Sequence, residues 1–79
     1  MFKLLRKKIG IIGFGNMGSA IAERIKYKYQ VFVFDKDKNK TVDLTKRNVA
    51  ENTLDLINKV DVVLLAVKPQ DFDSVLEEI

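Results

Sequence analysis

Apolar residues gather in short blocks along the chain, and charged or polar stretches separate these blocks. Three of the blocks predict buried strands, at Lys8 to Ile12, Val31 to Phe34 and Val62 to Val67. Each is continuous rather than alternating and rich in β-branched or aromatic residues, which is typical of parallel strands covered on both faces. The third block is the most apolar, so we expect it to be a central strand. Pro69 ends it, because proline has no N–H for the ladder.

Helical spacing is found between the predicted strands. From Asn16 to about Tyr27, apolar residues recur every turn while charged residues fill the other positions. Asn52 or Thr53 is suited to cap a helix that runs from Thr53 to Lys59. The other predicted elements are a weaker helix from Asp37 to about Lys46, a short edge strand at Asn48 to Ala50, and the opening of a helix at Asp71 to Ile79.

Strand and helix alternate throughout the chain, which predicts an α/β fold with a doubly wound parallel sheet and right-handed crossovers. We expect the strand order 3-2-1-4, with the sheet truncated after its fourth strand. Residues 62–67 then lie beside the first strand, where the strand order reverses and where ligands bind in such sheets. At 79 residues the chain is one small domain, whose core alone stabilises the fold only marginally.

Three glycines, Gly13, Gly15 and Gly18, directly follow the first predicted strand. Their G-x-G-x-x-G spacing, with Asp35 about twenty residues later, is typical of the dinucleotide-binding unit of a Rossmann-type sheet. We expect the first glycine to form a tight turn, the second to let a diphosphate approach the backbone, and the third to let helix and sheet pack closely. The helix that starts near Asn16 directs free N–H groups at the diphosphate. The alternative is an ordinary strand-to-helix turn.

Asp35 is expected to accept hydrogen bonds from the adenosine ribose, which favours NAD because a carboxylate repels the 2′-phosphate of NADP. Lys36 and Lys38 oppose this preference, since either side chain can neutralise that phosphate. The choice of NAD or NADP therefore leans to NAD on Asp35 alone. The other interpretation of Asp35 is a helix N-cap or a surface turn residue. Lys68 is either a solvated charge or a contact to the phosphate or nicotinamide ribose of the cofactor.

The amino-acid composition limits the catalytic and metal-binding groups that the chain can supply. The chain has no cysteine and no histidine, which removes thiolate nucleophiles, the commonest general base and the commonest metal ligand. Its net charge of +3 does not indicate a nucleic-acid partner, because the basic residues are spread over several segments without interleaved aromatic residues. The D-x-D-x-N run at 35–39 is similar to half a calcium loop, but Lys40 stands where its glycine is required. No metal site is expected.

Basic residues near the amino end, Lys3 and Arg6 among them, precede an apolar run from Ile9 to Ala22. Signal peptides share this outline, but the run holds four glycines, and its removal would delete the first strand. No segment has the unbroken apolar length of a membrane span. We therefore expect a cytoplasmic protein without a membrane partner.

The two most distinctive stretches are IGIIGFGNMGSAI at 9–21 and DVVLLAVKPQ at 61–70. Together they resemble the pyrroline-5-carboxylate reductases. The resemblance implies reduction of the cyclic imine Δ1-pyrroline-5-carboxylate to L-proline, the last step of proline biosynthesis, by hydride transfer from NAD(P)H. It implies that 12–17 line the diphosphate, Asp35 the adenosine ribose and 66–69 the nicotinamide half. The expected cofactor-binding residues are Ile12, Gly13, Phe14, Gly15, Asn16, Met17, Gly18, Asp35, Ala66, Val67, Lys68 and Pro69.

By the same resemblance, Asn52 or Thr53 also touches the cofactor. Judged from the residues alone, Met17 and the aromatic residues serve packing, with Phe14 placed to cover the diphosphate. Members of this family commonly use NADPH and carry a small polar or basic residue at the position of Asp35, which opposes the preference for NAD.

Enzymes of this family continue into a helical domain that forms the dimer and shapes the substrate pocket. The resemblance therefore implies that residues 1–79 are the amino-terminal NAD(P)-binding domain of a homo-oligomer, and that this piece alone binds dinucleotide weakly and reduces nothing. No catalytic residue is assigned. The alternatives are the cofactor domain of a β-hydroxyacid dehydrogenase or of a deazaflavin-dependent NADP reductase, and a non-catalytic dinucleotide sensor.

Overall fold

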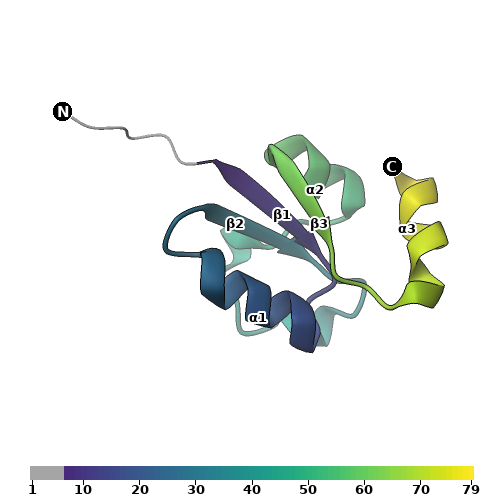
Figure 1. The fold of residues 1–79 in the computed structure, drawn as a ribbon, viewed down its shortest axis with the longest axis horizontal. Coiled ribbons are helices and arrows are strands. Elements are labelled where there is room, and N and C mark those ends of the chain that lie inside the picture. Colours follow the sequence, from purple (N-terminus) through teal and green to yellow (C-terminus); the bar gives the residue numbers. More distant parts are fainter. Residues whose placement is uncertain (1–6) are drawn as a thin grey trace.

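The computed structural model describes residues 7–79, so Lys3 and Arg6 lie outside the described residues. Strands β1 (Lys8–Ile12), β2 (Gln30–Phe34) and β3 (Val62–Leu65) form one parallel sheet in the order β2-β1-β3 (Figure 1). This arrangement confirms the predicted α/β fold and the predicted pairing of the last strand with the glycine-loop strand.

The two faces of β1 are covered by different helices. A side chain at Gly10 would meet Leu56 and Val60, whereas a side chain at Gly18 would meet Ile11. Because successive residues of a strand point to opposite faces, α2 (Thr53–Lys59) covers one face of the sheet and α1 (Asn16–Ile25) covers the other. Ile11 of β1, on the α1 side, and Leu56 of α2, on the other side, are completely buried. The core is therefore split into two layers by β1.

Beyond β3 the chain leaves the sheet through a 3₁₀ turn, η3 (Pro69–Asp71), and enters α3 (Phe72–Glu78). Pro69 begins this turn, as expected for a residue that ends the strand. In Figure 1, α3 stands beyond the carboxyl ends of the strands, and it contacts α2. The loops that precede α1 and α3 therefore meet at one end of the sheet.

The prediction of a helix from Asp37 to about Lys46 is wrong. The structure has two short 3₁₀ turns instead, η1 (Lys38–Thr41) and η2 (Lys46–Asn48). The Asp37 carboxylate accepts from the backbone N–H of Asn39 and favours a local turn. Val42 is 72% exposed, so the segment lacks an apolar face that would hold a longer helix against the sheet.

The expected strand at Asn48 to Ala50 is reduced to one parallel bridge between Val33 and Val49. The Ala50 N–H donates to the Val33 carbonyl at 2.8 Å, and the Asn48 side chain donates to the Val31 carbonyl at 3.0 Å. The segment thus lies along the outer edge of β2, where the order 3-2-1-4 places a third strand, but it is too short to continue the ladder.

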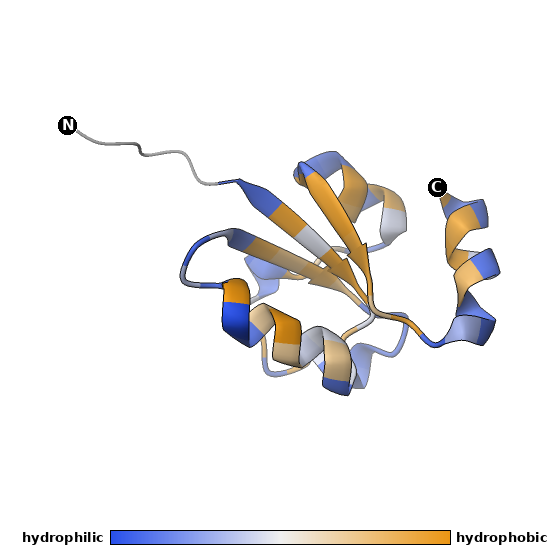
Figure 2. Cartoon of the chain, in the orientation of Figure 1, coloured by the Kyte–Doolittle hydropathy of each residue, from blue (hydrophilic) through white to orange (hydrophobic). Residues whose placement is uncertain are grey.

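The last strand also differs from expectation. It ends at Leu65 rather than Val67, and within residues 7–79 it pairs only with β1, so it is an edge strand rather than a central one. It is apolar along its whole length (Figure 2), yet Val62 is 39% exposed. The first helix ends at Ile25 rather than Tyr27. No helix among the described residues is long and apolar enough to cross a membrane.

Candidate functional site

A cleft of about 1170 Å³ opens at the carboxyl ends of the three strands. Its walls come from the glycine loop, the end of β2, the turn after β3 and the inner side of α3. Eleven of the twelve residues predicted to bind the cofactor line it: Ile12, Gly13, Phe14, Gly15, Asn16, Met17, Asp35, Ala66, Val67, Lys68 and Pro69. Segments far apart in sequence are therefore brought to one place, where doubly wound sheets bind their ligands.

Gly18, the twelfth predicted residue, does not line the cleft. A Cβ at Gly18 would overlap the carbonyl oxygen of Gly13, so its missing side chain lets α1 pack against the loop that precedes it. This is the packing role that the sequence predicts for the third glycine of the motif.

Gly13 forms the turn out of β1 with a φ of +99°, in a region that L side chains rarely adopt. A Cβ there would lie 2.5 Å from the carbonyl oxygen of Ala66. The turn therefore fixes both the direction of the loop and its contact with the chain leaving β3.

Gly15 faces open space. Among residues 7–79, and apart from Gly15 and its two chain neighbours, the only atom within 4 Å of a Cβ built there is Nζ of Lys40, at 3.7 Å. Gly15 also occupies the N-cap of α1, so the unpaired N–H groups of the first turn of this helix begin at the same point. An anionic group above Gly15 would meet backbone donors and no side chain of the loop.

Asp35 joins the end of β2 to the glycine loop. One carboxylate oxygen accepts from the backbone N–H of Phe14 at 2.7 Å, and the other accepts from the N–H of Asp37 at 2.8 Å. Each oxygen retains a further lone pair for another donor. The contact with a ribose stays a prediction, and the structure adds a loop-tethering role that sequence reasoning missed.

Charged groups of both signs line the cleft. The cations are Lys36, Lys40 and Lys68, and the acids are Asp35, Asp37, Asp71 and Glu78. The Lys36 ammonium lies 3.6 Å from an Asp71 carboxylate oxygen. Lys38, which the sequence offered as a phosphate partner, is not among the lining residues, whereas Lys40 is. The η1 turn brings Lys40 to the cleft. The sequence predicted a helix over this segment, and that helix did not indicate that Lys40 would line the cleft.

Thr53 rather than Asn52 lines the main cleft. The Thr53 side chain is only 4% exposed, and its hydroxyl donates to a Glu78 carboxylate oxygen at 2.8 Å, which links the start of α2 to the end of α3. Asn52 serves as the N-cap of α2: its side-chain oxygen accepts from the N–H of Asp55 at 2.8 Å. Because Thr53 is the first residue of α2, its position depends on the side chains that cap this helix.

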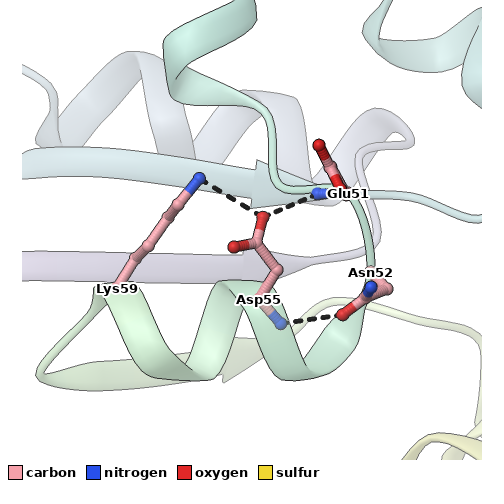
Figure 3. Close-up of polar contacts among 4 residues, drawn as sticks. All are labelled: Glu51, Asn52, Asp55 and Lys59. Carbon is pink, nitrogen blue, oxygen red and sulfur yellow. Dashed lines mark hydrogen bonds and ion pairs between the residues drawn. The ribbon is translucent and has the colours of Figure 1, made fainter.

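Asp55 completes this first turn, as Figure 3 shows. Its carboxylate accepts from the backbone N–H of Glu51 at 2.9 Å and lies 3.2 Å from the Lys59 ammonium. The hydrogen bond from Glu51 N–H and then the Lys59 charge lower the pKa of Asp55 below its usual value. The Asn52 and Asp55 side chains thus both cap the start of α2, an arrangement similar to a capping box except that Asp55 accepts from the N–H of Glu51 rather than from that of Asn52.

A carboxylate with a lowered pKa stabilises the folded state above its unfolded pKa, and this contribution is lost as the pH falls through the folded pKa. We therefore expect Asp55→Asn to lower the thermal unfolding midpoint at pH 7, and the difference from the unsubstituted chain to shrink towards about pH 2. Melting followed by circular dichroism over this range measures it, with Asp43→Asn as an exposed control. A difference that is the same at both pH values would contradict the capping role.

A family model described as "NADP oxidoreductase coenzyme F420-dependent" matches residues 8–79. The chain belongs to this family. Membership agrees with the fold and supports a pyridine dinucleotide as the cofactor of this NADP oxidoreductase domain, without deciding between NAD and NADP.

This NADP oxidoreductase domain is also similar to a curated protein named pyrroline-5-carboxylate reductase from Aquifex aeolicus (strain VF5). The two are 37% identical over 81 aligned positions, which cover 96% of this chain and 31% of the relative. The resemblance inferred from the glycine loop and the AVKPQ segment is therefore confirmed. The chain spans about a third of the length of that relative, and the comparison supports a pyrroline-5-carboxylate reductase or a related NADP oxidoreductase.

Proposed function

We propose that this chain is the dinucleotide-binding domain of an enzyme that reduces Δ1-pyrroline-5-carboxylate to L-proline with NAD(P)H. The relative from Aquifex aeolicus supports the reaction by its name. The observation that carries the cofactor assignment is the open space above Gly15 at the N-terminus of α1, within a cleft that holds eleven of the predicted contacts.

The proposed reaction adds a hydride to the imine carbon and a proton to the imine nitrogen. The cofactor, when bound, supplies the hydride. The residues of this chain bind and orient it: the backbone of the glycine loop holds the diphosphate, Asp35 the adenosine ribose, and 66–69 the nicotinamide half. No residue among those described is assigned as the proton donor, so the substrate pocket and the proton would come from a further helical domain of a homo-oligomeric, cytoplasmic protein.

Titration of the chain with NADH and NADPH tests the binding part of this proposal. Two carboxylates, Asp35 and Asp37, line the cleft at the end of β2 and support a preference for NAD. Asp35→Asn removes one charge while keeping the side-chain shape, and we expect the ratio of the two affinities to move towards NADPH by about tenfold, which corresponds to about 1.4 kcal/mol. Fluorescence of the reduced nicotinamide provides the measurement.

The ratio is the informative quantity, because asparagine has only one accepting oxygen, and losing the bond from Phe14 N–H or from Asp37 N–H is expected to weaken both cofactors together. Asp73→Asn is the matched control, since Asp73 is an exposed acid of α3 that does not line the cleft. An unchanged ratio would leave Asp35 with loop tethering alone, and absence of binding by the unsubstituted chain would refute the cofactor assignment. In the same samples we expect no proline formation, because no residue among 7–79 is assigned as the proton donor.

The family description favours one further candidate, a reductase that exchanges hydride between NADP and the deazaflavin F420. Both candidates require the same dinucleotide cleft and differ in the second reactant. An assay of the full-length protein with pyrroline-5-carboxylate and, separately, with reduced F420 distinguishes them.

A further inference from the structure

Lys40 lies beside the glycine loop. Its Nζ lies 3.7 Å from the point where a Cβ of Gly15 would stand. The backbone around it is held on both sides, because the N–H of Lys40 donates to the Asp37 carbonyl at 3.0 Å and the next residue, Thr41, is buried at 8% exposure. The η1 turn therefore places this exposed ammonium beside Gly15, at the start of α1.

Most of the other charges of the cleft have partners of their own, whereas Lys68, like Lys40, is in no ion pair among residues 7–79. Both oxygens of Asp35 accept backbone N–H groups, and a carboxylate oxygen of Asp37 accepts from the N–H of Asn39. Lys36 lies beside Asp71. Among residues 7–79, the ion pairs that involve a lysine are Lys26 with Glu23, Lys36 with Asp71 and Lys59 with Asp55, so no ion pair engages Lys40.

An anion above Gly15 would need this cation. The lining residues carry four acids and three lysines, so the cleft without Lys40 would hold only two lysines against four carboxylates. Backbone N–H groups at a helix start provide partial positive charge, but a diphosphate carries a larger negative charge than a helix end alone balances. An ammonium at hydrogen-bond reach compensates for the surrounding carboxylates.

We propose that Lys40 is a cation that binds the diphosphate of the dinucleotide, from its position beside Gly15 at the start of α1. This inference rests on the proposed dinucleotide binding and adds a contact outside the glycine motif. The residue acts on the phosphate common to NAD and NADP and leaves the choice between them to Asp35 and its neighbours.

The test compares Lys40→Gln with Lys38→Gln, titrated with ADP, NADH, NADPH and adenosine. Lys38 belongs to the same η1 turn and carries the same charge, but it does not line the cleft. We expect Lys40→Gln to weaken ADP, NADH and NADPH by about tenfold each, a factor between those of an exposed ion pair and a charged hydrogen bond. Lys38→Gln is expected to change them by less than about twofold, since only screened long-range charge is lost.

Adenosine, which lacks phosphate, should bind the two variants and the unsubstituted chain equally. Both lysines are exposed, so circular dichroism is expected to show unchanged folding. Equal effects of the two substitutions would overturn the proposal, as would a loss confined to NADPH, which would assign Lys40 to the 2′-phosphate. If the unsubstituted chain bound ADP and the Lys40 variant bound it equally well, only the role of Lys40 would fail. If no nucleotide bound the unsubstituted chain, the proposed function would fail with it.

Discussion

Gly18→Ala is expected to unfold most of the chain, although alanine is the better helix former. In an exposed helix this exchange would gain up to about 1 kcal/mol from propensity alone. Here the new Cβ would overlap the carbonyl oxygen of Gly13 and come within 3.0 Å of its carbonyl carbon. Both atoms belong to the backbone of a turn with positive φ, so neither can rotate away as a side chain does.

We expect a loss of about 3 kcal/mol or more, the upper range for overpacking. A single core of this size rarely supplies more than about 3–5 kcal/mol in total, so this loss removes most of the folded population. Urea unfolding followed by circular dichroism measures it. Glu23→Ala, on the exposed side of α1, is the control and should change stability by less than about 0.5 kcal/mol. A Gly18→Ala chain as stable as the control would show that α1 is not held against the glycine loop.

The parts of the fold that depend on continuous apolar patterns could be predicted from the sequence. The β1 block allowed only a strand buried on both faces, and Thr53–Lys59 formed a helix with the residues expected, because a side-chain cap at Asn52 fixes its start. The turn role of Gly13 and the packing role of Gly18 followed in the same way, whereas the approach of a diphosphate to Gly15 stays a prediction.

The segment between β2 and α2 could not be predicted, because its fold depends on tertiary contacts rather than on periodicity. Residues 37–46 contain few apolar side chains, and local carboxylate bonds decided between a helix and 3₁₀ turns. Because a helix was predicted here, the position of Lys40 beside Gly15 was not predicted either. The tethering of the glycine loop by Asp35 could likewise not be predicted, since its partner Phe14 is distant in sequence.

The edge position of β3 shows a different limit. Hydrophobicity predicts burial on both faces, but it does not say how many neighbours a strand has. Val62 to Leu65 are as apolar as a central strand, yet β3 pairs only with β1 among the described residues and stays partly exposed. Strand composition thus reports the environment for which a strand is suited, and pairing must come from the structure.

Gly15→Val is expected to leave the chain folded and to abolish dinucleotide binding. Gly15 is extended, with a φ of −82°, so its backbone lies outside the positive-φ region that favours glycine. The nearest atom to its new Cβ would be the flexible end of Lys40, at an ordinary contact distance of 3.7 Å. The fold therefore has room for the side chain, and the cost at an N-cap position is about 1 kcal/mol or less.

The same side chain would fill the space that a diphosphate needs to reach the N–H groups of α1. We expect the dissociation constants for NADH, NADPH and ADP to rise at least about a hundredfold, which corresponds to about 2.7 kcal/mol. Unfolding measured on the same samples separates this loss of binding from a loss of stability. Gly18→Ala is expected to show the opposite pattern, because it lowers stability without placing a side chain in the cleft. Retained binding by a folded Gly15→Val chain would mean that the phosphates lie elsewhere in the cleft, because a valine and a bound diphosphate cannot share the same volume.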